Sequence, residues 1–182
     1  MKDKIEKKLK RMNKELNALL QDLRGYSNER LNQSPAQGAW SVVQVLSHLF
    51  ISESKSLSYI QKKSQYAEGL MKNNLGSKAR SLLLRFYLQS PLKYKAPPMV
   101  DTQGREEQDF WELAKGYTKM REELESFLEN LPEEQFKQQI YRHPIAGRVS
   151  ISAMLDFFYD HFKRHRKQIY RTLRNIDAVK IQ

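Results

Sequence analysis

The sequence predicts an all-α protein made of one domain, and three observations carry this prediction. Apolar residues recur at three- and four-residue steps over four long stretches, which is the pattern of helices that bury one side. The composition combines 40% hydrophobic and 29% charged residues with only 7 Gly and 6 Pro, a balance typical of soluble, helix-rich proteins. A chain of 182 residues suits one hydrophobic core, so we expect a single domain over residues 1–182.

The composition also excludes several classes of protein. The chain has no cysteine, so disulfide scaffolds and cysteine nucleophiles are excluded, and any thiol chemistry needs a thiol from outside. No stretch approaches the ~20 apolar residues that span a bilayer, and the first residues mix both signs of charge. We therefore expect a cytoplasmic protein with no membrane partner. The net charge of +11 favours anionic partners but does not choose between nucleic acid, an acidic small molecule and solubility.

The first predicted helix covers residues 2–23 and ends before Gly25. Its polar side mixes Lys and Arg with acids, which is typical of a solvated face. Its buried stripe is formed by apolar residues at helical spacing, namely Ile5, Leu9, Met12, Leu16, Leu19, Leu20 and Leu23. Residues 24–38 then read as a loop, because Pro35 and Gly38 break any regular pattern.

The second predicted helix has a clear start at Ser41. The Ser41 hydroxyl is placed to accept the Gln44 backbone N–H while the Gln44 side chain reaches back to Ser41, and Trp40 is placed to pack on Val45. The helix continues through Ile60. We expect these local contacts to make the helix rigid from its first turn.

Two polar residues of the second helix face the protein interior. His48 lies at the edge of the apolar stripe. Glu53 lies within the stripe, between Leu49 and Leu57, where an unpaired carboxylate would be costly. Glu53 therefore needs a partner or a wet cavity.

The middle of the chain gives a weaker signal. A short extra helix is predicted over residues 78–88, followed by a loop through three prolines, Pro91, Pro97 and Pro98. A third long helix is predicted over residues 106–130, with Pro132 as its end. Residues 143–149 are predicted to form a turn, and Ser150 is predicted to be the N-cap of the last helix.

The last helix carries His161 and His165 on its inward side. Residues four apart on a helix lie one above the other, with Cβ atoms roughly 5–6 Å apart, so both imidazoles can bind one ion. Lys163 and Lys167 fall on the opposite, solvated side. The spacing permits two metal ligands, and a third must come from elsewhere.

His48 is the candidate third ligand, because its helix is expected to share the core with the last helix. Three neutral imidazoles leave an open coordination position, as in catalytic metal sites. In the alternative interpretation, His48, His161 and His165 are ordinary core residues with hydrogen-bond partners. Glu53 either accepts a hydrogen bond from an imidazole and orients that ring for the metal or is a partly solvated structural acid. His143 is predicted to be an exposed loop residue, with the lip of a pocket as its alternative.

These motifs resemble the DinB/YfiT-like superfamily. The resemblance is carried by Trp40-Ser41, His48-Leu49 and Glu53, then by a Pro-x-x-Gly turn at Pro144 and Gly147, and finally by His161, His165 and Gln168-Ile169. It implies a four-helix bundle whose long helices run up, down, down and up. In this chain the short extra helix and loop would lie between the second and third long helices. It also implies a homodimer and a divalent metal, zinc or nickel, held by His48, His161 and His165.

The resemblance leaves the chemistry open between two enzyme classes. Some members are similar to S-transferases that join a low-molecular-weight thiol, such as bacillithiol, mycothiol or glutathione, to an electrophilic small molecule. Others are labelled metal-dependent hydrolases, which use a metal-bound water and gain from a general base. Asp156 and Asp160 flank the histidine pair but lie off its helical face, which favours the transferase. The positive charge of the chain would help to bind a carboxylate-bearing thiol such as bacillithiol.

Two non-enzymatic functions complete the alternatives. Residues 161–182 contain seven basic residues and one acid, which a nucleic-acid-binding helix would use on phosphates. These residues are scattered around the helix and no nucleic-acid-binding motif accompanies them, so we do not expect a nucleic-acid partner. The other alternative is a bundle without catalysis that serves as a sensor or binding module.

Overall fold

The structure is a computed structural model that describes residues 2–89, 100–102 and 107–179. Its four long helices are α1 (Lys2–Leu23), α3 (Val42–Ser64), α5 (Phe110–Asn130) and α7 (Ile151–Val179). The shorter elements are α2 (Asn28–Asn32), α4 (Leu75–Gln89), α6 (Glu133–Phe136), β1 (Tyr141–His143) and β2 (Gly147–Val149). Among the described helices, none has the length and apolar character needed to cross a bilayer.

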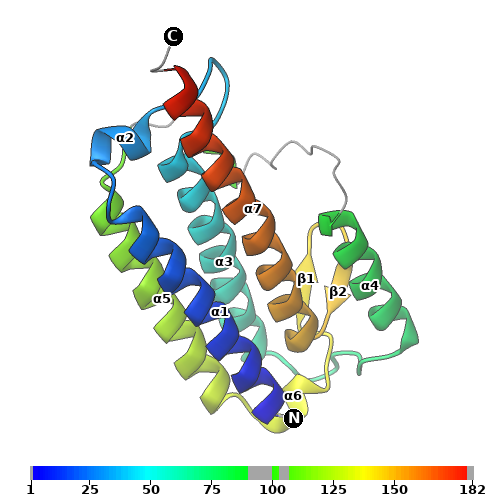
Figure 1. Cartoon of the computed structure of the whole chain (residues 1–182). Coiled ribbons are helices and arrows are strands. Elements are labelled where there is room, and N and C mark those ends of the chain that lie inside the picture. The colour runs from blue at the N-terminus through cyan, green and yellow to red at the C-terminus, as the bar shows by residue number, and fades with distance from the viewer. Residues whose placement is uncertain (1, 90–99, 103–106, 180–182) are drawn as a thin grey trace.

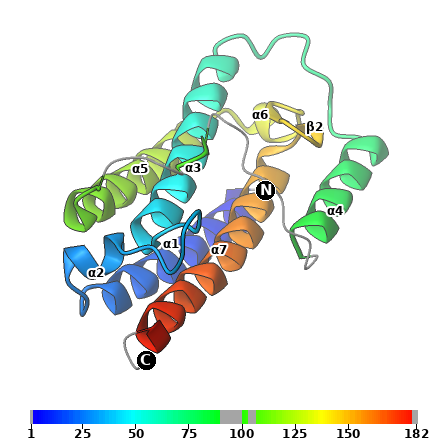
Figure 2. The ribbon, with the colours of Figure 1, turned by 90° about the horizontal axis from the view of Figure 1, so that it is seen from above.

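The long helices pack side by side as a bundle around one apolar core (Figure 1). The chain passes up α1, down α3, down α5 and up α7, which confirms the predicted all-α bundle and its order of directions. Because α3 and α5 run the same way, the chain must return along the bundle between them. This connection carries α4, which lies outside the four long helices on the side of α7 (Figures 1 and 2).

The helix starts follow the local sequence signals. At the start of α3, the Gln44 backbone N–H donates to the Ser41 hydroxyl at 3.2 Å, and the Ser41 N–H donates to the Gln44 side chain at 2.9 Å. The predicted capping box is therefore confirmed. At the start of α7, the Ala153 N–H donates to the Ser150 hydroxyl at 3.2 Å. Both caps satisfy backbone N–H groups that a helix leaves without partners.

Two predicted boundaries in the middle of the chain shift. The extra helix predicted over residues 78–88 runs from Leu75 to Gln89, because Asn74 and Ser77 exchange hydrogen bonds at its start. The third long helix begins at Phe110 after the N-cap Asp109, whose carboxylate accepts the Glu112 N–H. Position 106, its predicted start, lies outside the described residues, as does the predicted loop through Pro91, Pro97 and Pro98.

The prediction of an exposed His143 in a turn is wrong. Residues 141–149 form an antiparallel hairpin in which His143 pairs with Gly147, and the His143 side chain is buried. Alternation along β1 explains the burial, because Tyr141 and His143 face inward while Arg142 faces outward. The turn requires a glycine at position 147, where φ is +71°.

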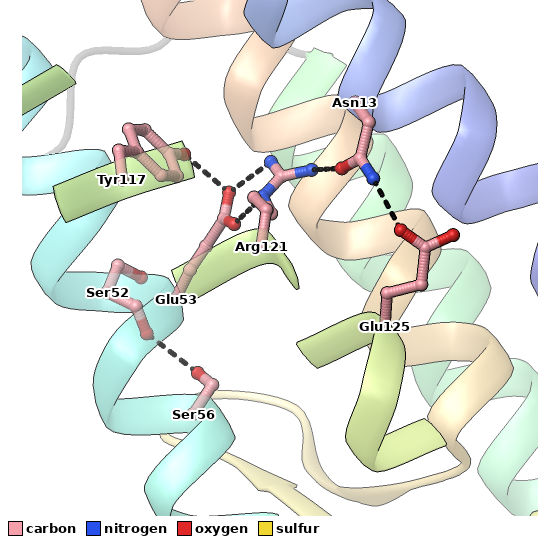
Figure 3. A network of polar contacts seen from close by, with 7 residues as sticks. All are labelled: Asn13, Ser52, Glu53, Ser56, Tyr117, Arg121 and Glu125. Atoms are coloured by element: carbon pink, nitrogen blue, oxygen red, sulfur yellow. Dashed lines mark hydrogen bonds and ion pairs between the residues drawn. The ribbon is translucent and has the colours of Figure 1, made fainter. Parts of the chain in front are cut away.

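A buried polar network joins α1, α3 and α5 (Figure 3). The Glu53 carboxylate accepts Arg121 Nε at 2.5 Å and Nη2 at 2.9 Å, and also accepts the Tyr117 hydroxyl at 2.7 Å. Arg121 Nη1 donates to the Asn13 side chain at 3.3 Å. Glu53 is fully buried and Arg121 is 3% exposed. The partner that Glu53 needs is therefore an arginine on another helix of the bundle.

We predict that Arg121→Met strongly destabilises the protein, because it leaves the Glu53 carboxylate buried without its cation. Removing one partner of a buried ion pair costs about 3–5 kcal/mol. Urea unfolding should show this loss, whereas Lys10→Met, which removes the exposed ion pair with Glu6, should leave the midpoint unchanged.

The double variant Glu53→Leu with Arg121→Met should recover much of the lost stability, because a neutral apolar pair carries no desolvation cost. Equal unfolding midpoints for Arg121→Met and Lys10→Met would contradict the importance assigned to the buried pair.

Candidate metal centre

Three imidazoles converge where α3 packs against α7. His161 Nε2 lies 3.2 Å from His48 Nε2 and 3.0 Å from His165 Nε2. His48 and His161 are buried, and His165 is partly buried. One ligand atom from each residue lies within 4.8 Å of the other two. We call these three residues the histidine cluster. In the chain, His48 is 113 residues from His161, and His165 is 4 residues from it. The structure thus brings the three candidate ligands together.

Hydrogen bonds behind two of the rings fix which nitrogen carries the proton. His48 Nδ1 lies 2.7 Å from the Val100 carbonyl oxygen, and His165 Nδ1 lies 2.9 Å from Gln168 Oε1. Both oxygens accept, so both Nδ1 atoms must donate when the rings are neutral. The Nε2 lone pairs of His48 and His165 consequently point into the cluster. This is the tautomer that a metal ligand needs.

His161 occupies the centre of the cluster. The neutral ring carries one proton, and its Nε2 offers a lone pair to the cluster when that proton is on Nδ1. Its Nδ1 is buried without a hydrogen-bond partner among the described residues, and its ring stacks on Phe157 at 5.2 Å between centroids. A cation at the point of convergence would interact favourably with three lone pairs. The donor set therefore fits a divalent metal ion.

Burial keeps these imidazoles neutral. Desolvation lowers the pKa of His48, although the Val100 carbonyl and the Asp101 charge oppose it. Desolvation, followed by repulsion from His165 and His48, lowers the pKa of His161 well below its ordinary value. Desolvation and repulsion from His48 lower the pKa of His165 to about 3. Neutral imidazoles are the form that coordinates metals, so no proton has to be displaced at neutral pH.

The acidic residues considered from the sequence lie elsewhere. The hydrogen bonds of Glu53 go to Tyr117 and Arg121, so these contacts do not support a role in orienting an imidazole, and its full burial excludes a partly solvated acid. Asp156 pairs with Lys8, and Asp160 pairs with Arg85. Both aspartates therefore point away from the histidines, as their spacing along the helix predicts.

Two groups behind the rings were not assigned a role from the sequence. Gln168 lies three residues after His165 on the same helix, so the i, i+3 spacing could have identified it. The Val100 carbonyl gives no comparable signal, because any residue supplies a main-chain oxygen. Trp40, which is expected to pack on Val45, also lies with its ring 5.1 Å from the His48 ring.

The fourth histidine lies close to the cluster without joining it. His143 Nδ1 accepts the backbone N–H groups of Ile145 and Ala146 at 3.2 and 3.1 Å. Its ring packs edge-on against Phe157, with 4.5 Å between centroids, and Phe157 in turn stacks on His161. His143 thus closes the hairpin turn and supports the aromatic ring that covers His161.

We predict that His143 makes the protein less stable in mild acid. Burial lowers the pKa of His143 to about 4, so between pH 6.5 and 4 the unfolded state binds more protons than the folded state. The free energy of unfolding should therefore fall as the pH drops through this window, with His143 contributing up to about 3 kcal/mol.

His143→Asn keeps an acceptor for the turn and removes the titration, so its stability should depend less on pH than that of the wild type. Urea unfolding with EDTA present, at several pH values from 7 to 4, measures the difference. Parallel profiles for the two proteins would contradict the assignment.

Comparisons with known proteins show the family of the chain. The model of the DinB superfamily matches residues 8–169, a range that includes all three clustered histidines. The chain is also 25% identical over 169 residues to the uncharacterized protein YuaE of Bacillus subtilis (strain 168), with 87% of this chain and 92% of the relative covered. No solved structure gives a significant match. The chain belongs to the DinB superfamily.

Proposed function

We propose that His48, His161 and His165 hold a divalent metal ion, zinc or nickel, and that the protein is a thiol-dependent S-transferase. The observation that carries the metal site is the convergence of three Nε2 atoms, with separations of 3.0 and 3.2 Å from the central one. The Val100 and Gln168 oxygens behind two of the rings support it, because outer hydrogen bonds of this kind orient metal-ligating histidines.

The transferase chemistry would use the open position of a three-histidine site. When bound, the ion would supply a positive charge that favours the thiolate form of a small thiol. The thiol would lose its proton to solvent, its sulfur would form a bond to an electrophilic carbon, and the leaving group would depart with its electron pair. The chain itself has no cysteine, so the sulfur must come from a soluble thiol such as bacillithiol.

Positive charge near the cluster supports an anionic co-substrate. The charge of Arg164 contributes to lowering the pKa of both His161 and His165, so its field reaches the cluster. Arg164 Nη1 donates to the Leu88 carbonyl at 3.0 Å, which holds the guanidinium between α7 and α4. The same field would attract a thiolate or the carboxylates of bacillithiol.

A hydrolase is the second candidate, and Asp101 is the observation that favours it. Its carboxylate raises the pKa of His48 by its charge, so an acid lies within electrostatic reach of the cluster. Hydrolysis would require this carboxylate to act as a general base toward water.

We predict that the protein, purified without a His tag and incubated with Zn²⁺ or Ni²⁺, holds about one equivalent of metal after desalting. His161→Ala removes the central ligand and should reduce this to less than about a tenth of an equivalent. His143→Asn is the matched control, because it changes a buried histidine outside the cluster and should retain the metal. Elemental analysis measures all three proteins. Equal metal content in the wild type and His161→Ala would contradict the site.

We predict that bacillithiol stabilises the metal-loaded protein against heat, since a ligand that binds only the folded state adds about 2.7 kcal/mol at a hundred times its Kd. The stabilisation should vanish in His161→Ala and should persist in Asp101→Asn. Bacillithiol with its thiol blocked by methylation is the control ligand.

Hydrolysis would give a different result in the same set of proteins. No thermal shift with bacillithiol, together with ester hydrolysis that Asp101→Asn abolishes, would favour the hydrolase over the transferase.

A further inference from the structure

Helix α4 has two apolar sides, and only one of them is covered. Leu84 and Leu88 are buried in the core. Four other apolar residues point away from the protein and are 56–82% exposed, and we call them the outer stripe: Leu75, Leu82, Leu83 and Phe86. These positions fall within about 100° of helical rotation, so they form one continuous face. An apolar face of this kind, left open to solvent, marks an interaction surface.

The helix is held firmly enough to present this face. The Arg80 guanidinium donates to the Arg148 carbonyl at 2.9 Å and to Gln139 at 2.8 Å. Near the other end, Arg85 pairs with Asp160 at 3.2 Å. The outer stripe is thus already formed on a folded helix, and binding needs little further ordering.

Positive charge lies beside the outer stripe. Lys72 and Lys78 are exposed beside it. Among the described residues that follow Glu68, up to the end of α4, four are basic and none is acidic. A complementary surface is apolar where it meets the stripe and negatively charged where it meets Lys72 and Lys78.

A second copy of the chain does not meet this requirement. Lys78 and Arg85 lie seven residues apart on the same flank of the stripe, and in an antiparallel pair of α4 helices these flanks would face each other, with the charge of Arg85 partly offset by Asp160. Each copy also carries a net charge of +11. A helix of 15 residues is only about 22 Å long, so a pair formed through this face would be small and opposed by like charges.

We propose that the outer face of α4 docks on the surface of an anionic lipid bilayer. Leu75, Leu82, Leu83 and Phe86 would enter the boundary between headgroups and acyl chains, while Lys72 and Lys78 would contact lipid phosphates. The sequence predicts no membrane partner because no segment can span a bilayer. An interfacial helix needs no such segment, since it lies in the plane of the surface.

The test is cosedimentation of the full-length protein with vesicles of phosphatidylcholine and phosphatidylglycerol in a ratio of about 3:1 at low salt. We expect binding to these vesicles and much weaker binding to pure phosphatidylcholine. Leu82→Ser with Phe86→Ser should reduce the binding about tenfold or more. The matched control is Trp111→Ser, which removes a 48% exposed aromatic side chain on α5 and should leave binding unchanged.

A second pair of variants tests whether the vesicles bind at the lysines beside α4 or are attracted by the positive charge of the whole protein. Lys72→Glu with Lys78→Glu should weaken binding strongly, whereas Lys4→Glu with Lys7→Glu, an equal charge change at exposed positions of α1, should have a small effect. Equal losses in both pairs, or retained binding in Leu82→Ser with Phe86→Ser, would overturn the proposal.

Two further measurements complete the test. Thermal unfolding of each variant must match the wild type, as expected for exposed side chains. Sedimentation velocity without lipid measures self-association. A wild-type dimer that Leu82→Ser with Phe86→Ser converts to a monomer, with no vesicle binding in either protein, would overturn the proposal in favour of a dimer interface.

Discussion

The packing of α3 against α7 is the constraint on which the candidate site depends. His48 Nε2 on α3 can lie 3.2 Å from His161 Nε2 on α7 only if the two helices keep a fixed register and separation. The Ser41 and Ser150 caps fix where each helix begins, and Phe157 and Trp40 limit how the rings can turn. A small shift of either helix would separate the nitrogens, so the rigidity of the bundle is a condition of the chemistry.

The Glu53–Arg121 pair holds α3 on another side, where this helix packs against α5. It joins α3 to α5, and its link to Asn13 extends the contact to α1. Buried ion pairs add little net stability compared with apolar residues, but they accept few alternative partners. A shifted α3 would leave the Glu53 carboxylate buried without its cation, so the pair disfavours other registers of the helix that carries His48.

Much of the bundle and its histidines could be predicted because the signals are local. A capping box lies within four residues, and the His161–His165 spacing lies within one helical turn. The rest depends on contacts between distant segments. Glu53 finds its cation 68 residues later in the chain, and His143 is buried because a hairpin turns it inward. No local pattern indicated that one side of α4 would stay uncovered.

The hydrogen bond between His48 and the Val100 carbonyl has an evolutionary consequence. Because the acceptor belongs to the main chain, position 100 can change its side chain freely without losing the group that orients the ring. Natural selection would act there on the path of the backbone and leave little trace in residue identity. Among relatives as divergent as 25% identity, the hydrogen bond to His48 would be kept through the length and geometry of the loop. Sequence alignments record these two properties poorly.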